Sequence, residues 1–339
     1  MAEVTGEGRL RFAVLGAFRV DRDGQVVDLG PRLQRTLLAI LVVEAGHVVR
    51  ADRLLGLLWR DEPPAAASAS VQAYVSQLRR VLEPDRAPRT PAAVLVTQDP
   101  GYVLRVADGQ VDALRFQALA RQAQDDLAAG RAAAAAARLE DAFALWRGDP
   151  LAEFADEPWA GPAVARFTEA YDLAAEDRID AWLALGRHAD AVAELEAMVG
   201  ARPWRERRWG QLIVASYRCG QRADALRAYQ RCRTMLAGEL GLEPGPELRR
   251  LEAAVLAQDA SLGWQPDPAA AVGAAPAPPV TAGARSAAAR PTGEPSAPSL
   301  VSRAAELARL REAFRRAATG HGGAGVLVGE PGAGKTTLA

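Results

Sequence analysis

The sequence predicts an α+β domain at the N-terminus, an all-α domain after it, and a final segment that ends within a glycine-rich loop. Strand-like runs, turn signals and helical patterns alternate over residues 9–106, whereas apolar residues recur at helical spacing through the alanine-rich residues 112–258. Residues 263–298 consist mainly of Ala, Pro, Gly and Ser, a composition that cannot bury a core. We therefore expect a first domain over residues 1–110, a helical domain over 111–260, a flexible linker over 261–299 and an incomplete last domain over 300–339.

Composition excludes several classes of protein. Of the 339 residues, 49% are hydrophobic, which is enough for packed cores. No apolar run approaches the roughly 20 residues that a bilayer-spanning helix needs, and the acidic start, Met1 to Glu7, does not resemble a secretion signal. Cys219 and Cys232 are too few for a disulfide framework or a zinc site, so we expect them to pack within helices. We expect a cytoplasmic protein that does not contact membranes.

The first domain begins with a predicted antiparallel sheet. Residues 9–20 alternate apolar and polar side chains, Asp23-Gly24 is a hairpin turn signal, and residues 26–29 form the next strand.

Three helices are expected after this sheet. Pro31 can open the first one. Asp52 is predicted to cap the second helix, over residues 53–59. The third helix runs from about residue 65 to residue 82 and has apolar side chains spaced to face a core, namely Val71, Val75, Leu78 and Leu82.

A two-stranded ribbon is predicted to close the domain. It consists of residues 94–98, a tight Asp99-Pro100-Gly101 turn and residues 102–106. A sheet, three helices and a C-terminal ribbon are, in this order, the elements of a winged helix-turn-helix. The alternative at this point is a general α+β domain with no nucleic-acid role.

The third predicted helix shows a small, polar face opposite its apolar stripe, with few carboxylates. Gln can pair with adenine through two hydrogen bonds and Ala can meet a thymine methyl group, while Ser, Tyr and Arg can contact phosphates. An ordinary solvated helix surface is the alternative for any one residue, but the whole face, followed by a wing, favours DNA binding. The residues of this face are Ser70, Gln72, Ala73, Tyr74, Ser76, Gln77, Arg79 and Arg80.

The helical domain contains an internal repeat. The stretch around Gly186 recurs around Gly220, a step of 34 residues, which is the period of tetratricopeptide repeats. Residues 127–131 resemble a third, degenerate copy. Such repeats carry no chemistry of their own and present surfaces to partners or to a neighbouring domain. We expect His188 to be a surface turn residue without a ligand role.

The last segment contains a phosphate-binding loop. Residues 329–336 fit the pattern G-x-x-x-x-G-K-[ST], in which backbone N–H groups surround phosphates, the lysine reaches the β- and γ-phosphates and the threonine holds Mg²⁺. The chain ends three residues later, so we expect an N-terminal fragment of a longer regulator. This chain would have no enzyme activity and no cofactor, whereas the full-length parent would bind ATP and Mg²⁺ and act as an ATPase. The predicted nucleotide-binding residues are Gly329, Gly332, Gly334, Lys335 and Thr336.

Several stretches carry a family resemblance. Residues 70–82 (SVQAYVSQLRRVL), followed by residues 96–102 (VTQDPGY), resemble the recognition helix and wing of OmpR/PhoB-type winged helices. The closer resemblance is to the Streptomyces antibiotic regulatory protein (SARP) family, and to its large ATPase-containing members. These proteins join such a domain to a tetratricopeptide-like bacterial transcriptional activation domain. Residues 57–59 (LLW) before Asp-Glu-Pro-Pro are typical of the family, and residues 241–248 (GLEPGPEL) are characteristic of the activation domain.

The resemblance implies a role for individual residues. Base-contacting positions are held by Gln72, Ala73 and Gln77. Backbone-contacting positions are held by Ser70, Tyr74, Ser76 and Arg79. Thr97 and Gln98 lie in the wing, where relatives often have an arginine in place of Gln98, so a strong minor-groove contact is not expected. The predicted polymerase-contact loop comprises Trp59, Arg60, Asp61, Glu62, Pro63 and Pro64.

By the same resemblance, the protein is expected to activate transcription of antibiotic or other secondary-metabolite genes. It would bind tandem direct repeats near the −35 region of promoter DNA as a homodimer, and would contact RNA polymerase through sigma factor or the alpha subunit, in the nucleoid. One alternative is an ATP-regulated signalling scaffold whose front domains bind proteins and not DNA, and another is a repressor. The operator, the target genes, the signal sensed and the phosphorylation sites do not follow from the sequence.

Overall fold

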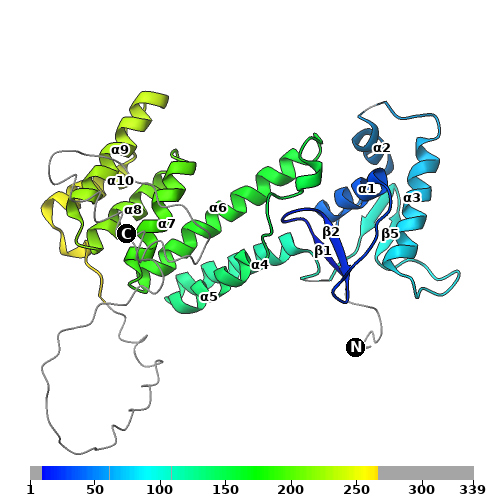
Figure 1. The fold of residues 1–339 in the computed structure, drawn as a ribbon, viewed down its shortest axis with the longest axis horizontal. Helices are drawn as coiled ribbons and strands as arrows, with labels where there is room; N and C mark the ends of the chain where they lie inside the picture. The colour runs from blue at the N-terminus through cyan, green and yellow to red at the C-terminus, as the bar shows by residue number, and fades with distance from the viewer. Residues whose placement is uncertain (1–9, 61, 108, 266–339) are drawn as a thin grey trace, which may run out of the picture. The chain divides into compact units, whose positions relative to one another are not determined.

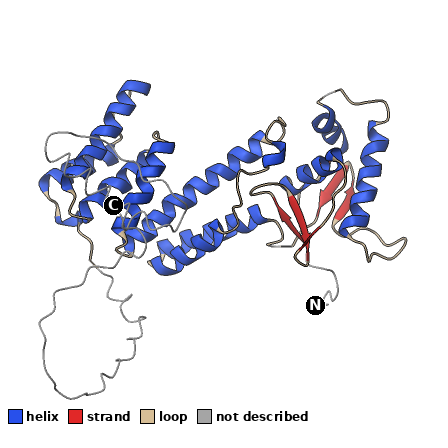
Figure 2. Ribbon diagram, viewed as in Figure 1, coloured by secondary structure: helices blue, strands red, loops and turns tan. Residues whose placement is uncertain are grey.

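The described chain forms a small sheet-and-helix domain followed by a helical domain. The computed structural model describes residues 10–265, apart from residues 61 and 108. Figure 2 shows the strands gathered in the N-terminal domain and helices in the rest of the described chain. This order confirms the predicted α+β domain followed by an all-α domain. The predicted linker from residue 266 onward and the predicted last domain lie outside the described residues.

The N-terminal domain combines three helices with two small sheets (Figure 1). Its elements are β1 (Leu10–Ala13), β2 (Arg19–Arg22), β3 (Gln25–Val26), α1 (Arg32–Val43), β4 (Val49–Arg50), α2 (Ala51–Trp59), α3 (Ala67–Leu82), β5 (Leu95–Gln98) and β6 (Gly101–Leu104). The first three strands form an antiparallel sheet in the order β1-β2-β3. Asp23 and Gly24, both at positive φ, form the turn between β2 and β3 that the Asp-Gly signal predicts.

The three helices pack around one core. α1 packs against both α2 and α3. α3 buries the predicted stripe of Val71, Val75, Leu78 and Leu82, each at most 3% exposed. Because this stripe fixes which way α3 faces, the opposite side of the helix is left to solvent.

The predicted start of α2 was wrong. The helix begins at Ala51, and Asp52 lies inside its first turn and does not cap it. The reason is that β4 runs directly into α2, so that Arg50, in extended conformation, takes the capping position. The carboxylate of Asp52 instead accepts hydrogen bonds from the Arg50 side chain and the Arg53 backbone N–H.

The predicted ribbon is one strand wider than expected. β4 joins β5 and β6 in a sheet of order β4-β6-β5, with Arg50 opposite Gly101. A two-residue strand has no periodicity to detect, so the sequence did not indicate it. Gly101 is required here, because a Cβ at this position would lie 2.0 Å from the Val49 carbonyl oxygen.

The helical domain is built from consecutive helices packed side by side. Its elements are α4 (Asp112–Ala128), α5 (Ala132–Phe143), the short 3-10 helix η1 (Ala152–Phe154), α6 (Gly161–Ala184), α7 (His188–Ala201), α8 (Glu206–Arg218), α9 (Arg222–Leu240), α10 (Pro246–Ala257) and η2 (Ala260–Leu262). Each of α4 to α9 packs against the next helix in the chain. Among the described residues, no helix is both long and apolar enough to span a bilayer.

One turn structure occurs three times in this domain. Gly130, Gly186 and Gly220 end α4, α6 and α8, with φ of 73°, 78° and 77°. In each case the glycine N–H donates to the carbonyl three residues back, and the next residue donates to the carbonyl five residues back. This pattern satisfies the last carbonyls of a helix and favours glycine, which tolerates positive φ. The predicted recurrence of the turn is confirmed.

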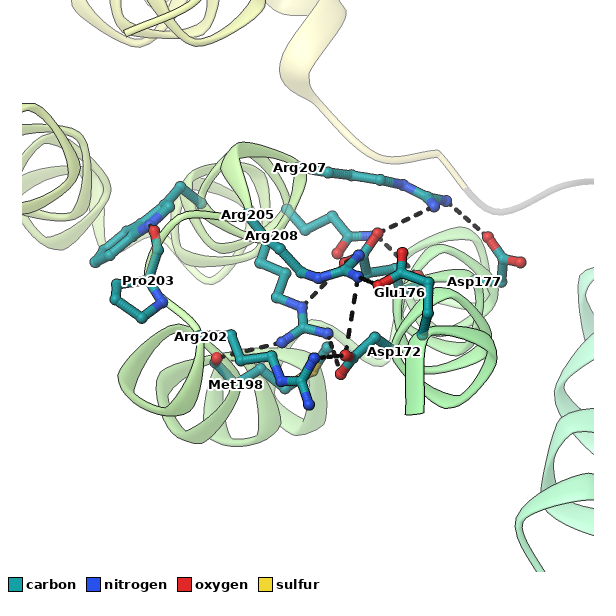
Figure 3. Close-up of polar contacts among 12 residues, drawn as sticks. Asp172, Glu176, Asp177, Met198, Arg202, Pro203, Arg205, Arg207 and Arg208 are labelled. Carbon is teal, nitrogen blue, oxygen red and sulfur yellow. Dashed lines mark hydrogen bonds and ion pairs between the residues drawn. The ribbon is translucent and has the colours of Figure 1, made fainter. Parts of the chain in front are cut away.

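A buried ionic network joins α6 to α8 (Figure 3). Arg208, on α8, is 2% exposed and donates to Asp172 at 2.7 Å and to Glu176 at 3.0 Å, both on α6. Arg205 and Arg207 also contact Glu176, at 3.1 and 3.3 Å. Every member of such a network must be paired, because an unpaired charge in the core is strongly unfavourable.

The hydrophobic core of the N-terminal domain continues into α4, α5, η1 and α6 of the helical domain, whereas the helices from the end of α6 to α10 pack around a second core. Phe18, after β1, lies 6.0 Å from Phe154 of η1 between ring centres. Asp112, the first residue of α4, accepts hydrogen bonds from the backbone N–H groups of Val14 and Leu15. Burial raises the pKa of Asp112, and these hydrogen bonds and the nearby Arg147 oppose the rise. The two domains are therefore connected by packing and by polar contacts as well as by the chain.

The prediction that His188 is a surface turn residue was wrong. His188 is 9% exposed and begins α7, with its ring 5.5 Å from that of Trp264. The described chain ends by packing back on the helical domain, where Trp264 Nε1 donates to the Ala184 carbonyl at 3.0 Å. This return of the chain covers the imidazole. Cys232 is buried within α9, as predicted, whereas Cys219 is half-buried and follows the last residue of α8.

Candidate nucleic-acid interface

The face of α3 opposite its buried stripe is open to solvent. Ser70 and Tyr74 are half-buried: the Ser70 hydroxyl donates to the Ala66 carbonyl, and Tyr74 packs against the core. The predicted site residues of α3 that are exposed are Gln72, Ala73, Ser76, Gln77 and Arg80. The structure therefore brings the predicted base-contacting side chains together on one accessible surface.

The electrostatics of α3 suit an approach to a polyanion. The helix contains no Asp or Glu, and its first turns consist of Ala and Ser. Arg79 and Arg80 lie in its last turn. Small side chains allow the helix backbone to come close to base edges, and the absence of carboxylates removes repulsion from phosphates.

The wing lies against the C-terminal half of α3. Thr97 and Gln98 are exposed on β5, and Gln98 pairs with Gly101 beside the turn. Arg79 is half-buried between α3 and β5, and its guanidinium donates to the Leu95 carbonyl and to the Thr97 hydroxyl. The sequence pattern placed Arg79 on the exposed face and did not indicate this contact, which depends on where the ribbon packs.

Arg50 is an additional candidate that the sequence did not single out. It lies opposite Gly101 in the sheet, next to the wing turn, and 63% of its side chain is exposed. Asp52 and, to a smaller extent, Asp99 raise its pKa. The pairing of β4 with β6 places Arg50 beside the wing, and this pairing could not be predicted from the sequence.

The predicted polymerase-contact loop follows α2 directly. Trp59 packs partly into the core, and Arg60 ends the helix at a positive φ of 52° and reaches Glu157 at 3.4 Å. Glu62, Pro63 and Pro64 are exposed, and Asp61 lies outside the described residues. A cleft of about 570 Å³ lies beside the start of this loop, lined partly by Arg53 and Trp159. The predicted nucleotide-binding residues, from Gly329 to Thr336, also lie outside the described residues.

A three-helix domain with an open α3 face, a wing beside it and a helical domain joined to it defines a winged-helix transcription regulator. Residues 24–104 match the family model described as "Transcriptional regulatory protein, C terminal", and residues 111–256 match the model described as "Bacterial transcriptional activator domain". The chain belongs to the Streptomyces antibiotic regulatory protein family of transcriptional activators, with an OmpR/PhoB-type DNA-binding domain.

Regulators from two genera are similar to this chain in sequence. Regulatory protein DnrI of Streptomyces peucetius is 34% identical over 74% of this chain and 93% of its own length. Regulatory protein AfsR of Streptomyces coelicolor is 38% identical over 100% of this chain, which spans 33% of AfsR. Transcriptional regulatory protein EmbR of Mycobacterium tuberculosis is 39% identical over 75% of this chain and 65% of its own length. The chain thus spans a third of AfsR and just under two thirds of EmbR.

The fold is also similar to a solved structure. The structure of Mycobacterium tuberculosis EmbR in complex with a low-affinity phosphopeptide matches with a TM-score of 0.71 and 39% identity, over 74% of this chain and 66% of that chain. At this level of identity, the likeness supports both the fold and the family.

Proposed function

We propose that this chain is a sequence-specific activator that reads promoter DNA with α3 and the wing. The observation that carries the proposal is the exposed α3 face: it is polar and free of carboxylates, it lies opposite a fully buried stripe, and the wing packs beside it. A domain that only bound proteins would not need this combination. The family to which the chain belongs supports the same function.

Residue roles follow from side-chain chemistry and exposure. Gln72, Ala73 and Gln77 contact base edges in the major groove. Backbone contacts are made by Ser70, Tyr74, Ser76, Arg80 and Thr97, with Gln98 at the wing tip and Arg50 beside it. Arg79, which the sequence also assigns to the backbone, has its guanidinium engaged by the wing. Two of these assignments are constrained, because Ser70 and Tyr74 are half-buried and would contact DNA only with their outer atoms.

The same proposal covers assembly on promoter DNA, contact with RNA polymerase and nucleotide binding. The protein binds tandem direct repeats near the −35 region of secondary-metabolite promoters as a homodimer, and the loop from Trp59 to Pro64 contacts sigma factor or the alpha subunit of RNA polymerase. Exposure of Glu62, Pro63 and Pro64 supports an accessible loop. The tetratricopeptide-like helical domain mediates self-association. In a longer parent protein, ATP and Mg²⁺ bind the loop from Gly329 to Thr336.

A selection of genomic DNA fragments by the purified protein, followed by footprinting of the best site, tests this function. We expect enrichment of paired direct repeats about one helical turn apart, which corresponds to roughly 10 base pairs. Because backbone contacts alone bind any DNA, the selection is done at moderate salt. Absence of enrichment over random fragments would contradict the proposed function and would favour a protein-binding scaffold.

A further inference from the structure

Arg79, in the last turn of α3, and Glu83, which caps the C-terminus of this helix, bind the wing and the residues just before it. Arg79 Nε donates to the Leu95 carbonyl at 2.8 Å, and its Nη2 donates to Thr97 Oγ1 at 2.7 Å. Glu83 accepts hydrogen bonds from the backbone N–H groups of Ala93 and Val94, at 2.7 and 3.2 Å, just before β5. Arg79 and Glu83 therefore together hold the segment from residue 93 to residue 97 against the end of α3.

We propose that Arg79 is a positioning residue, which fixes the wing at a set distance from the base-reading face of α3 and orients the Thr97 hydroxyl toward DNA. This inference rests on the proposed function and assigns Arg79 a different role from the direct phosphate contact that the sequence predicts. The wing and α3 then meet the DNA as one rigid surface, and the spacing between their contacts is set by the protein.

The geometry of the guanidinium favours positioning over a direct contact. Arg79 is half-buried, and two of its donor atoms are used by the wing. Hydrogen bonds from a charged donor are about twice as strong as neutral ones. Arg80, the next residue, is exposed, and among the described residues its side chain has no ion-pair or hydrogen-bond partner. Arg80 is therefore the arginine of α3 that is free to contact phosphates.

The Thr97 hydroxyl gains a defined direction from this contact. A hydroxyl has one proton to donate and two lone pairs. Because Oγ1 accepts from Arg79, its own proton is left to be donated to another acceptor. Thr97 is exposed on β5, next to Gln98 and the wing turn, where a phosphate oxygen can serve as that acceptor.

Three variants of the full chain test the inference on the selected DNA site. Arg79→Lys keeps the positive charge and loses the planar fork of donors. Thr97→Val keeps the shape and loses the hydroxyl, and Thr97→Ser restores the hydroxyl. We expect Arg79→Lys and Thr97→Val to bind about tenfold more weakly, with an unchanged salt dependence, and to lose hydroxyl-radical protection on the wing side only. Thr97→Ser should bind within about twofold of the unchanged protein.

Arg121→Lys, on the exposed surface of α4, is the matched control and should bind normally. Thermal unfolding shows whether Arg79→Lys folds. If it does not, the comparison of Thr97→Val with Thr97→Ser, at an exposed position, still decides the test. Binding of Arg79→Lys within twofold of the unchanged protein, or equal weakening by Thr97→Val and Thr97→Ser, would overturn this inference alone. If the unchanged protein selects no site, the proposed function fails and the inference fails with it.

Discussion

Arg208 brings a positive charge into the core of the helical domain, with 2% of its side chain exposed. It is held by Asp172 and Glu176, and both carboxylates also contact other arginines (Figure 3). Residue type alone would assign a charged side chain such as this arginine to the surface. The pairing could not be predicted from the sequence, because the carboxylates are more than 30 residues away along the chain.

We expect Arg208→Ala to lower the free energy of unfolding by about 3 kcal/mol, because Asp172 and Glu176 lose their buried partner and keep only contacts with more exposed arginines. Arg227→Ala is the matched control: Arg227 pairs with Asp224 on the surface and is 68% exposed, so its loss should cost less than about 1 kcal/mol. Urea unfolding measures the loss of stability in both variants. Similar small losses in the two variants would show that the network does not stabilise the fold.

The buried imidazole of His188 predicts a dependence of stability on pH. Among the residues that the structure describes, neither ring nitrogen has a hydrogen-bond partner, and burial, assisted by the charge of Arg218, lowers the pKa of His188 below its ordinary value of 6.5. The unfolded chain therefore takes up this proton first. The stabilising contribution is present above pH 6.5 and is lost as the pH falls through the lowered pKa.

We expect the free energy of unfolding to fall between about pH 7.5 and pH 5.5, and to fall less in His188→Phe, which cannot be protonated. Phenylalanine keeps an aromatic ring against Trp264. Urea unfolding of both proteins at about pH 7.5 and pH 5.5 gives the four free energies of unfolding that the comparison needs. Equal losses in the two proteins would mean that His188 is protonated as easily in the folded chain as in the unfolded one.

The three glycine turns are elements with the same local structure and different surroundings. Gly186 and Gly220 have φ of 78° and 77°. A Cβ at Gly186 would lie 2.7 Å from the Trp264 ring, whereas a Cβ at Gly220 would meet nothing within 4 Å. The conformational requirement is shared, but only Gly186 must also leave room for the end of the described chain.

Gly220→Ala should therefore cost only the strain of positive φ, roughly 1–2 kcal/mol in the free energy of unfolding. Gly186→Ala should cost more, and should shift the tryptophan fluorescence as Trp264 leaves its site. Thermal unfolding and fluorescence of the two variants measure the difference. Equal costs with unchanged fluorescence would contradict the packing of Trp264 on this turn.

Elements whose signals are local could be predicted from the sequence. The stripe of α3, the Asp23-Gly24 turn and the recurrent glycine turns each depend on residues close together in the chain. Strand β4 could not be predicted, because two residues show no period and its pairing with β6 spans about half of the domain. For the same reason α2 begins earlier than its Asp52 signal indicates.

At the scale of the whole molecule, the described domains behave as one packed unit. Phe154 is 1% exposed and contacts Phe18 of the N-terminal domain and Trp159. Arg35, on α1, pairs with Glu153 of η1 at 2.5 Å. The composition of the sequence predicted a change of fold class near residue 110 but could not predict that the core continues across it, because composition does not report contacts between distant segments.

We expect the region from residue 10 to residue 265 to unfold in a single cooperative transition. Phe154→Ala should remove about 3–5 kcal/mol of stability and separate the unfolding of the two domains, because it opens a cavity in their shared core. Circular dichroism and tryptophan fluorescence, followed together during urea unfolding, show whether the two domains unfold in one transition or in two. Two separate transitions in the unchanged protein would contradict a shared core.

The candidate site was predictable in part. The exposed residues of α3 follow from helical geometry, so Gln72, Gln77 and Arg80 lie where the pattern predicts. Arg79 has the same spacing but bends toward β5, because the wing offers it a carbonyl and a hydroxyl. Its packing environment, and the position of Arg50 beside the wing, arise only from the tertiary fold.

The most direct test of the central claim, that the exposed face of α3 reads bases, is the affinity of Gln72→Ala and Gln77→Ala for the selected site and for a scrambled site at one salt concentration. The account predicts that each substitution costs about 1–3 kcal/mol on the selected site and little on the scrambled one, so that specificity is reduced. Equal losses on both DNAs, or no loss on either, would contradict it.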